Sequence, residues 1–169
     1  DGHSNFQTEE QKQEQKQNEI KIQMGKAIDV LKVDYPELFS RDPNFDIYSE
    51  DIVFEIRSTG PLGYVSRGKK QYMKQYPRVR KVASSCLEDV KVTYNLKQQS
   101  EGGNIVVSWR IEGLLFKREM DVRGKSYYEF DTSNGLIKRH SVEFTETTPP
   151  IEEILPLLRD LFRQKTWLW

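Results

Sequence analysis

Alternating apolar and polar side chains constrain this chain more than any other feature of its sequence. In the segment Val90–Lys97, valine, tyrosine and leucine alternate with lysine, threonine and asparagine. A period of two places the apolar side chains on one face of a β-strand and the polar ones on the other. The pattern recurs, and it predicts strands over residues 47–56, 90–97, 105–112, 120–130 and 136–144.

Other segments repeat apolar residues at helical spacing. The segment Ile20–Tyr35 carries one apolar stripe, and Pro36 is expected to end or kink that helix. A second helix is predicted from Gly68 to about Tyr76, stopped near Pro77; the stretch after this proline is ambiguous. A third helical pattern runs over residues 151–162.

The order of these elements predicts an α+β fold. We expect a cone-like, curved antiparallel sheet packed against the N-terminal helices, followed by a C-terminal helix. A bent sheet wrapped on a helix leaves a cone whose mouth can form a pocket. A chain of 169 residues suits one domain, which we place at residues 20–145.

Both flanks of this domain are expected to be extensions. Residues 1–19 form a polar N-terminal extension, since no apolar residue occurs between Phe6 and Ile20; it is either a solvated tail or a continuation of the following helix. Residues 146–169 form a C-terminal helical extension. Its end, Trp167–Trp169, is expected to cap the cone or to dock on another chain.

Composition excludes several protein classes. The chain has 26 basic and 26 acidic residues, which argues against a bulk polyelectrolyte binder. A single cysteine rules out an internal disulfide framework and a cysteine-based zinc finger. No apolar run approaches the roughly 20 residues that span a bilayer. We expect neither a metal site nor a cofactor.

The zero net charge is a sum of unlike parts. Residues 1–55 hold 13 acidic and 6 basic side chains, whereas residues 56–87 hold 8 basic and no acidic ones; residues 88–169 are nearly balanced. The basic stretch therefore offers a directed surface for a partner, and its candidate binding residues are Arg67, Lys69, Lys70, Lys74, Arg78, Arg80 and Lys81.

Three interpretations of this basic stretch stay open. It can be the solvated face of one helix, neutralised by the acidic residues before it. It can bind an acidic protein or an anionic membrane surface. Tyr64, Tyr72 and Tyr76 interleave with the cations and could stack on nucleic-acid bases. Nucleic acid is disfavoured, because only one segment of the chain is basic.

Some motifs resemble a known superfamily. The helix before residue 36, the segment Ile47–Phe54 and the segment Gly68–Tyr72 resemble the nuclear-transport-factor-2-like superfamily. Its members share a cone-shaped α+β fold and include enzymes, small-molecule binders and scaffold proteins.

A narrower resemblance covers about residues 24–145. It is to an uncharacterised family of organellar and cyanobacterial proteins within that superfamily. The segments that carry it are Asp34–Phe39, Val107–Gly113, Gly124–Tyr128 and Gly135–His140. The resemblance implies a fold and a location in a plastid or mitochondrion, but it implies no reaction.

The resemblance disfavours isomerase chemistry. Ketosteroid isomerases of this fold use an Asp base and a protonated Asp, and here Ile56 and Ser126 stand in those places. His140 is the candidate catalytic residue, because a pocket histidine near Glu112 or Asp121 could act as a base. A structural histidine is the alternative.

The expected pocket-lining residues are Trp109, Arg110, Tyr128 and His140. Arg57 or Arg110 could bind a carboxylate ligand inside the cone, or face outward from the sheet. Cys86 is expected to be a small buried apolar residue rather than a nucleophile.

These observations favour a non-catalytic organellar accessory or interaction protein. It would bind a protein partner or larger complex through the sheet face, the basic helix or the termini, and a homodimer through the sheet is one such assembly. The alternative is a small hydrophobic ligand binder, or a lyase or isomerase, that uses the cone pocket near His140.

Overall fold

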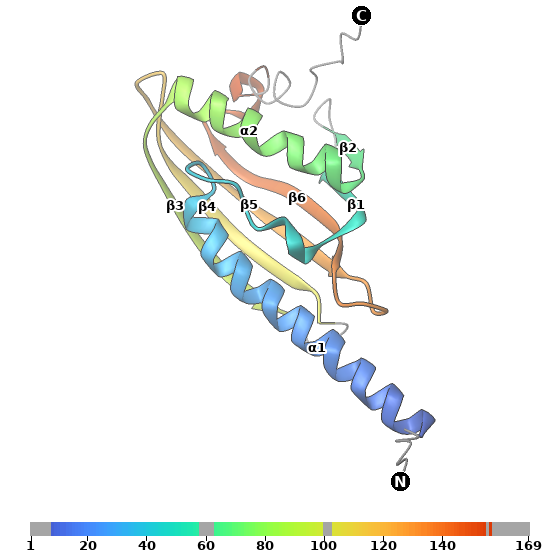
Figure 1. Ribbon diagram of the computed structural model, residues 1–169. Helices are drawn as coiled ribbons and strands as arrows, with labels where there is room; N and C mark the ends of the chain where they lie inside the picture. Colours follow the sequence, from blue (N-terminus) through green and yellow to red (C-terminus); the bar gives the residue numbers. More distant parts are fainter. Residues whose placement is uncertain (1–7, 58–62, 100–102, 155, 157–169) are drawn as a thin grey trace, which may run out of the picture.

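A computed structural model of the chain describes residues 8–57, 63–99, 103–154 and 156. It confirms the α+β fold, with two long helices on one side of a six-stranded curved sheet (Figure 1). In chain order the elements are α1 (Glu9–Asp34), η1 (Tyr35–Glu37), η2 (Phe45–Ile47), β1 (Tyr48–Arg57), β2 (Tyr64–Arg67), α2 (Lys69–Cys86), β3 (Leu87–Gln98), β4 (Ile105–Leu115), β5 (Arg118–Phe130) and β6 (Ile137–Thr148).

The strands follow the order β2-β1-β6-β5-β4-β3. Four of the five pairings are antiparallel, but β1 and β6 run parallel, with Phe54 opposite His140. The expectation of a wholly antiparallel sheet is corrected at this pair. The chain leaves β1, forms the rest of the sheet and returns beside β1 in the same direction, which local alternation cannot reveal.

Helix α1 begins far earlier than its apolar stripe. Residues 9–19 are its first, solvent-exposed turns, so the interpretation as an extension of the helix is the correct one for them. Thr8 starts the helix with a capping box, in which its hydroxyl accepts from the Gln11 amide and the Gln11 side chain accepts from the Thr8 amide. In Figure 1 this half of α1 extends beyond the sheet.

Helix α2 runs through Pro77, which corrects the expected stop there. A proline inside a helix removes one backbone hydrogen bond. Burial on the far side of the proline outweighs that loss, because Ala83 and Cys86 pack into the interior beneath the helix. The ambiguous stretch after Pro77 is therefore helical, and α2 covers the wide end of the cone.

The strand β3 accommodates a bulge opposite Gly113. Asp89 has a φ of 53°, and the β3–β4 register shifts between Glu88 and Lys91. A Cβ on Gly113 would lie 2.8 Å from the Glu88 carbonyl oxygen, so only glycine fits beside the bulge. The irregularity therefore lies on β3, while β4 supplies the glycine that makes room for it.

Some sequence predictions fall outside the described residues. These are the terminal Trp167–Trp169 and most of the expected C-terminal helix beyond residue 156. Of the predicted C-terminal helix, residues 151–154 and 156 are described and are helical. Strand β2 was not predicted. None of the helices in the described part of the chain has the length and apolarity needed to cross a membrane.

Candidate ligand-binding cavity

A cavity of about 260 Å³ lies between the helices and the concave face of the sheet. Most of its lining is aliphatic or aromatic and comes from α1, α2, five of the strands and the helical turn at Ile151 and Ile154. Trp109, Tyr128 and His140 line it, as the sequence placed them. Ile56 and Ser126 line it too, so the positions that hold acids in the isomerases face this cavity without one.

Gly124 sets the position of the Trp109 ring. The indole lies where a Cβ on Gly124 would stand, and Trp109 Nε1 donates to Ser126 Oγ at 3.1 Å. Trp109 and Gly124 stand directly opposite each other on β4 and β5. Because Gly124 has no side chain, the Trp109 ring can pack directly against β5 at the cavity wall.

Tyrosine hydroxyls form a large part of the polar lining. The hydroxyl of Tyr72 lies 2.8 Å from that of Tyr76 and 2.8 Å from Nδ1 of His140. The hydroxyls of Tyr35 and Tyr128 lie 2.8 Å apart. Burial raises the pKa of Tyr35 to about 12 and raises that of Tyr72 well above its usual value, so these phenols stay neutral.

His140 is enclosed by aromatic rings from Phe54, Tyr72 and Tyr128. Burial lowers its pKa from 6.5 to about 3, so the imidazole is neutral at physiological pH. Among the described residues its Nε2 has no hydrogen-bond partner, and it is the one buried side-chain nitrogen or oxygen in that state. A buried polar atom without a hydrogen-bond partner destabilises a folded protein, unless a bound molecule supplies the missing hydrogen bond.

The two hydrogen bonds that link Tyr76, Tyr72 and His140 can run in either direction. If Tyr72 donates to Nδ1, then Nε2 carries the hydrogen and is a donor. If Nδ1 donates to Tyr72, which donates onward to Tyr76, then Nε2 is an acceptor. The chain can therefore present either hydrogen-bonding character at Nε2.

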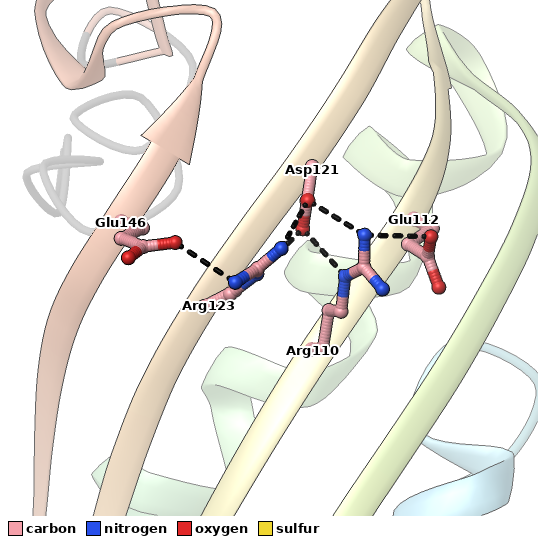
Figure 2. Close-up of polar contacts among 5 residues, drawn as sticks. All are labelled: Arg110, Glu112, Asp121, Arg123 and Glu146. Atoms are coloured by element: carbon pink, nitrogen blue, oxygen red, sulfur yellow. Dashed lines mark hydrogen bonds and ion pairs between the residues drawn. The ribbon is translucent and has the colours of Figure 1, made fainter.

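None of the carboxylates in the described part of the chain supports His140 as a base. Glu112 and Asp121 both lie on the outer face of the sheet, where they pair with Arg110, so the expectation that either could activate the histidine is wrong (Figure 2). The carboxylate that does line the cavity, Asp34, is held by Arg41 at 3.1 Å and accepts from the Asn44 amide.

Arg110 does not line the cavity, which corrects its expected placement. It alternates with Trp109 along β4, so the two side chains leave opposite faces of the sheet. Figure 2 shows its guanidinium making two hydrogen bonds to Asp121, at 2.9 and 2.8 Å, while Arg123 reaches the same carboxylate and Glu146. These bonds hold the pKa of Asp121 well below its usual range.

Arg57 also faces outward. It pairs with Glu55 at 2.9 Å and lies over the Tyr127 ring, 5.1 Å from its centroid. Glu55 further accepts from Ser141 and pairs with Arg139, and these contacts, the Ser141 hydrogen bond foremost, lower its pKa. The outer face is thus a set of mutually paired charges.

The expected basic residues divide into two groups. Lys69 pairs with Glu50 at 3.2 Å, and Arg80 pairs with Asp42, so these two are neutralised by the acidic segment before them. For the remaining cations, no ion pair joins them to a carboxylate of the described residues. They are Arg67 on β2 and Lys70, Lys74, Arg78 and Lys81 on α2.

Tyr72 and Tyr76 are not available to stack on bases. Both point from α2 into the cavity, whose wall they form with Tyr35 and Tyr48. None of these four tyrosines was predicted to line the pocket. Their signal was present in the i, i+4 spacing of Tyr72 and Tyr76, which places them on one face of a helix that continues past Pro77.

Cys86 is a buried apolar residue. Its thiol donates to the Val82 carbonyl oxygen at 3.0 Å, and burial raises its pKa. Within the described ranges, no three side chains of histidine, cysteine, aspartate or glutamate gather where they could hold a metal ion.

Comparison with solved structures shows the nuclear-transport-factor-2-like fold. Bal32a, from a soil-derived mobile gene cassette, is 14% identical with a TM-score of 0.58, over 83% of this chain and 99% of that one. An NTF2-like protein from Anabaena variabilis is 16% identical with a TM-score of 0.54, over 77% and 91%. A phenazine biosynthesis-related protein (PhzB2) from Pseudomonas aeruginosa is 15% identical with a TM-score of 0.54, over 83% and 90%.

No curated protein matches the chain. The model of one family, described as an uncharacterized conserved protein (DUF2358), matches residues 25–140, which is more than half of the chain. This range agrees with the resemblance at residues 24–145, and it includes the tyrosines and His140 of the cavity. The chain belongs to the DUF2358 family, and its fold is NTF2-like.

Proposed function

We propose that this protein is a non-catalytic binder of a small, mainly apolar molecule that carries one hydrogen-bonding group. The observation that carries the proposal is the cavity of about 260 Å³ beside the unpartnered, buried Nε2 of His140. A ligand hydroxyl or carbonyl at Nε2 would supply a hydrogen bond to the one buried side-chain polar atom that lacks a partner among the described residues.

The volume limits the ligand. An engineered apolar cavity of about 150 Å³ holds benzene, so a cavity of this size suits roughly ten non-hydrogen atoms. This volume is slightly below the range of about 300 Å³ upward that is common for natural ligand pockets. The cavity therefore suits molecules of one or two rings with a single polar group. A ligand with two charges is disfavoured, because the charged lining residues Asp34 and Arg41 already pair with each other.

Proton transfer is a poor match to the same geometry. A general base works best when its pKa lies near the operating pH, and the pKa of His140 is about 3. Its Nδ1 is bonded to a neutral phenol rather than to a carboxylate. Binding without turnover is therefore the better account of this cavity.

The test is a ligand panel on the folded protein. Phenol, indole and 2-naphthol are titrated beside naphthalene, which lacks the polar group, and binding is followed by calorimetry and thermal unfolding. At 100 times its Kd, a ligand should add about 2.7 kcal/mol to the free energy of unfolding. His140→Phe should weaken 2-naphthol about tenfold and leave naphthalene unchanged, because one hydrogen bond is lost.

Two further variants bracket this result. Ala83→Met fills the cavity from α2 and should remove binding of every panel member. Arg110→Gln lies on the opposite face and should change none of the affinities. Equal weakening of 2-naphthol and naphthalene in His140→Phe would refute the role of Nε2, and binding that survives Ala83→Met would place the ligand elsewhere.

The expected protein partner and sheet homodimer stay predictions. A dimer through the outer face would have to desolvate the half-exposed Arg110, Asp121 and Arg123 network, which is costly unless a second copy supplies new partners. The organellar location likewise stays a prediction, supported by the resemblance alone.

A further inference from the structure

Four cations of α2 line up on its solvent side. Lys70, Lys74, Arg78 and Lys81 fall within about a quarter of the helix circumference, at 3.6 residues per turn. The buried residues of α2, including Tyr72 and Ala83, lie on the opposite side. We call the four cations the basic ridge; three of them are exposed and Arg78 is half-buried.

Helix stability does not explain the ridge. Lys70 with Lys74, and Lys74 with Arg78, are like charges at i, i+4, and such pairs destabilise a helix. The first turn of α2 holds Lys69 and Lys70 and no acidic residue, although the positive end of the helix dipole lies there. The neighbouring carboxylates neutralise Lys69 and Arg80 and leave the ridge without a partner among the described residues. An external anion would remove this repulsion.

The composition of the ridge indicates which anion it suits. Three of its four cations are lysines, which are depleted at protein–protein interfaces, and it presents none of the tryptophan or tyrosine anchors that such interfaces use. The ridge has no exposed aromatic side chain on which nucleic-acid bases could stack, since Tyr72 and Tyr76 face the cavity. Flexible lysine point charges suit a diffuse, planar array of phosphates.

The shape agrees with a planar partner. The ridge runs over 12 residues, about 17 Å of one helix that lies on the outside of one end of the molecule (Figure 1). The other exposed residues from Lys70 to Lys81 are Gln71, Met73 and Pro77, so the ridge has no acidic neighbour among them. The acidic first turns of α1 begin at the other end of the molecule, away from such a contact.

We propose that the basic ridge docks this protein peripherally and reversibly on an anionic phospholipid surface. All four ammonium and guanidinium groups can approach one plane at the same time. Each cation near such a surface contributes about fivefold in affinity, and the attraction falls as salt screens it. The proposal does not depend on the ligand of the cavity.

The test is vesicle flotation at low salt with the full chain. Vesicles of phosphatidylcholine alone are compared with vesicles of equal parts phosphatidylcholine and phosphatidylglycerol. The triple variant Lys70→Gln, Lys74→Gln, Lys81→Gln removes three ridge charges. A matched triple variant, Lys91→Gln, Lys97→Gln, Lys125→Gln, removes the same charge from exposed positions on the strands. Circular dichroism checks that each variant is folded.

We expect binding to the mixed vesicles alone, a loss of about 100-fold in the ridge variant, and a much smaller loss in the strand variant. Raised salt should release the wild type. Equal losses in the two triple variants would overturn the proposal, as would no flotation of the wild type. A polyglutamate peptide and an RNA duplex serve as rival probes, and tighter, ridge-dependent binding of either one would overturn it as well.

Discussion

The imidazole of His140 lies face to face with the phenol ring of Tyr128, with the ring centroids 4.3 Å apart and the planes inclined by 16°. This stack shields one side of the histidine, and Phe54 and Tyr72 cover it further. His140 is only 6% exposed, so little water is available to solvate a positive charge on its ring. Its protonation and the folding of the chain are consequently coupled.

We predict that acidification destabilises the protein through His140. The pKa of this residue is about 3 when folded and near 6.5 when unfolded. The unfolded chain therefore binds the extra proton first, so stability is full above pH 6.5 and falls as the pH drops toward 3. Between pH 6.5 and 4.5 the loss should be about 2 kcal/mol, measured by urea unfolding.

Two variants assign this loss to the histidine. His140→Gln should remove most of the dependence in that pH window. Tyr72→Phe keeps the imidazole and should retain it. The same slope in wild type and His140→Gln would show that another group is responsible.

We predict that Tyr72→Phe costs about 1–3 kcal/mol in the free energy of unfolding. The phenol oxygen joins Tyr76 and His140, and its removal leaves two buried polar groups without their shared partner. Tyr94→Phe is the control, because that hydroxyl donates to the Lys32 carbonyl oxygen at an exposed site. An equal cost for the two variants would argue against a special role for the buried chain.

Two glycines should respond to alanine in opposite directions. At Gly124 a methyl group would collide with the Trp109 ring and the Glu143 carbonyl oxygen, so Gly124→Ala should destabilise by about 1–3 kcal/mol and shift the tryptophan fluorescence. At Gly25, inside α1, nothing lies within 4 Å of the added methyl group. Gly25→Ala should therefore stabilise by up to about 1 kcal/mol. Thermal unfolding of both variants decides the matter.

Lys74→Gln should stabilise the fold although it removes a charged surface residue. Two like-charge pairs along α2 disappear, each worth about 0.2–0.5 kcal/mol at low salt. The gain should vanish at high salt, where the repulsion is screened. Lys69→Gln is the contrast, because it breaks the pair with Glu50 and should give no gain. A gain for Lys74→Gln that is independent of salt would contradict the electrostatic cause.

Asp121→Asn should destabilise by about 0.5–1 kcal/mol at pH 7. The carboxylate separates Arg110 from Arg123, which stand directly opposite each other on β4 and β5. The pKa of Asp121 is lowered by these arginines, so its contribution is present above about pH 4 and is lost as the pH falls through the folded value. Unfolding measured at pH 7 and in acid should show the two proteins converging.

The sequence predicted the strands and the concave-facing residues well, because a period of two has one physical meaning in a half-buried sheet. It placed Trp109, Tyr128 and His140 at the cavity for this reason. The same period shows that Trp109 and Arg110 cannot share a face, so assigning both to the pocket went against the pattern itself. Only one of the two could lie inside.

The remaining differences come from information that local pattern does not carry. Pro77 predicts a helix end because proline lacks the backbone N–H that a helix needs. Only the packing of the residues beyond it shows that the helix continues. The parallel pairing of β1 with β6 joins residues 86 to 89 positions apart and leaves no local signature. The polar residues 9–19 bury nothing, yet the capping box at Thr8 starts a helix there that joins the apolar stripe.

Helix α2 has one side in the cavity wall and the other in the basic ridge. Tyr72 and Lys74 are two residues apart, so a ligand that shifts or stiffens the helix also changes the surface on its outer side. By thermodynamic linkage, such an effect is reciprocal. If a bound ligand raises the affinity of the ridge for its partner by some factor, the bound partner raises the affinity of the cavity for the ligand by the same factor. If the cavity and the basic ridge both bind as proposed, ligand binding and surface attachment are linked through this one helix.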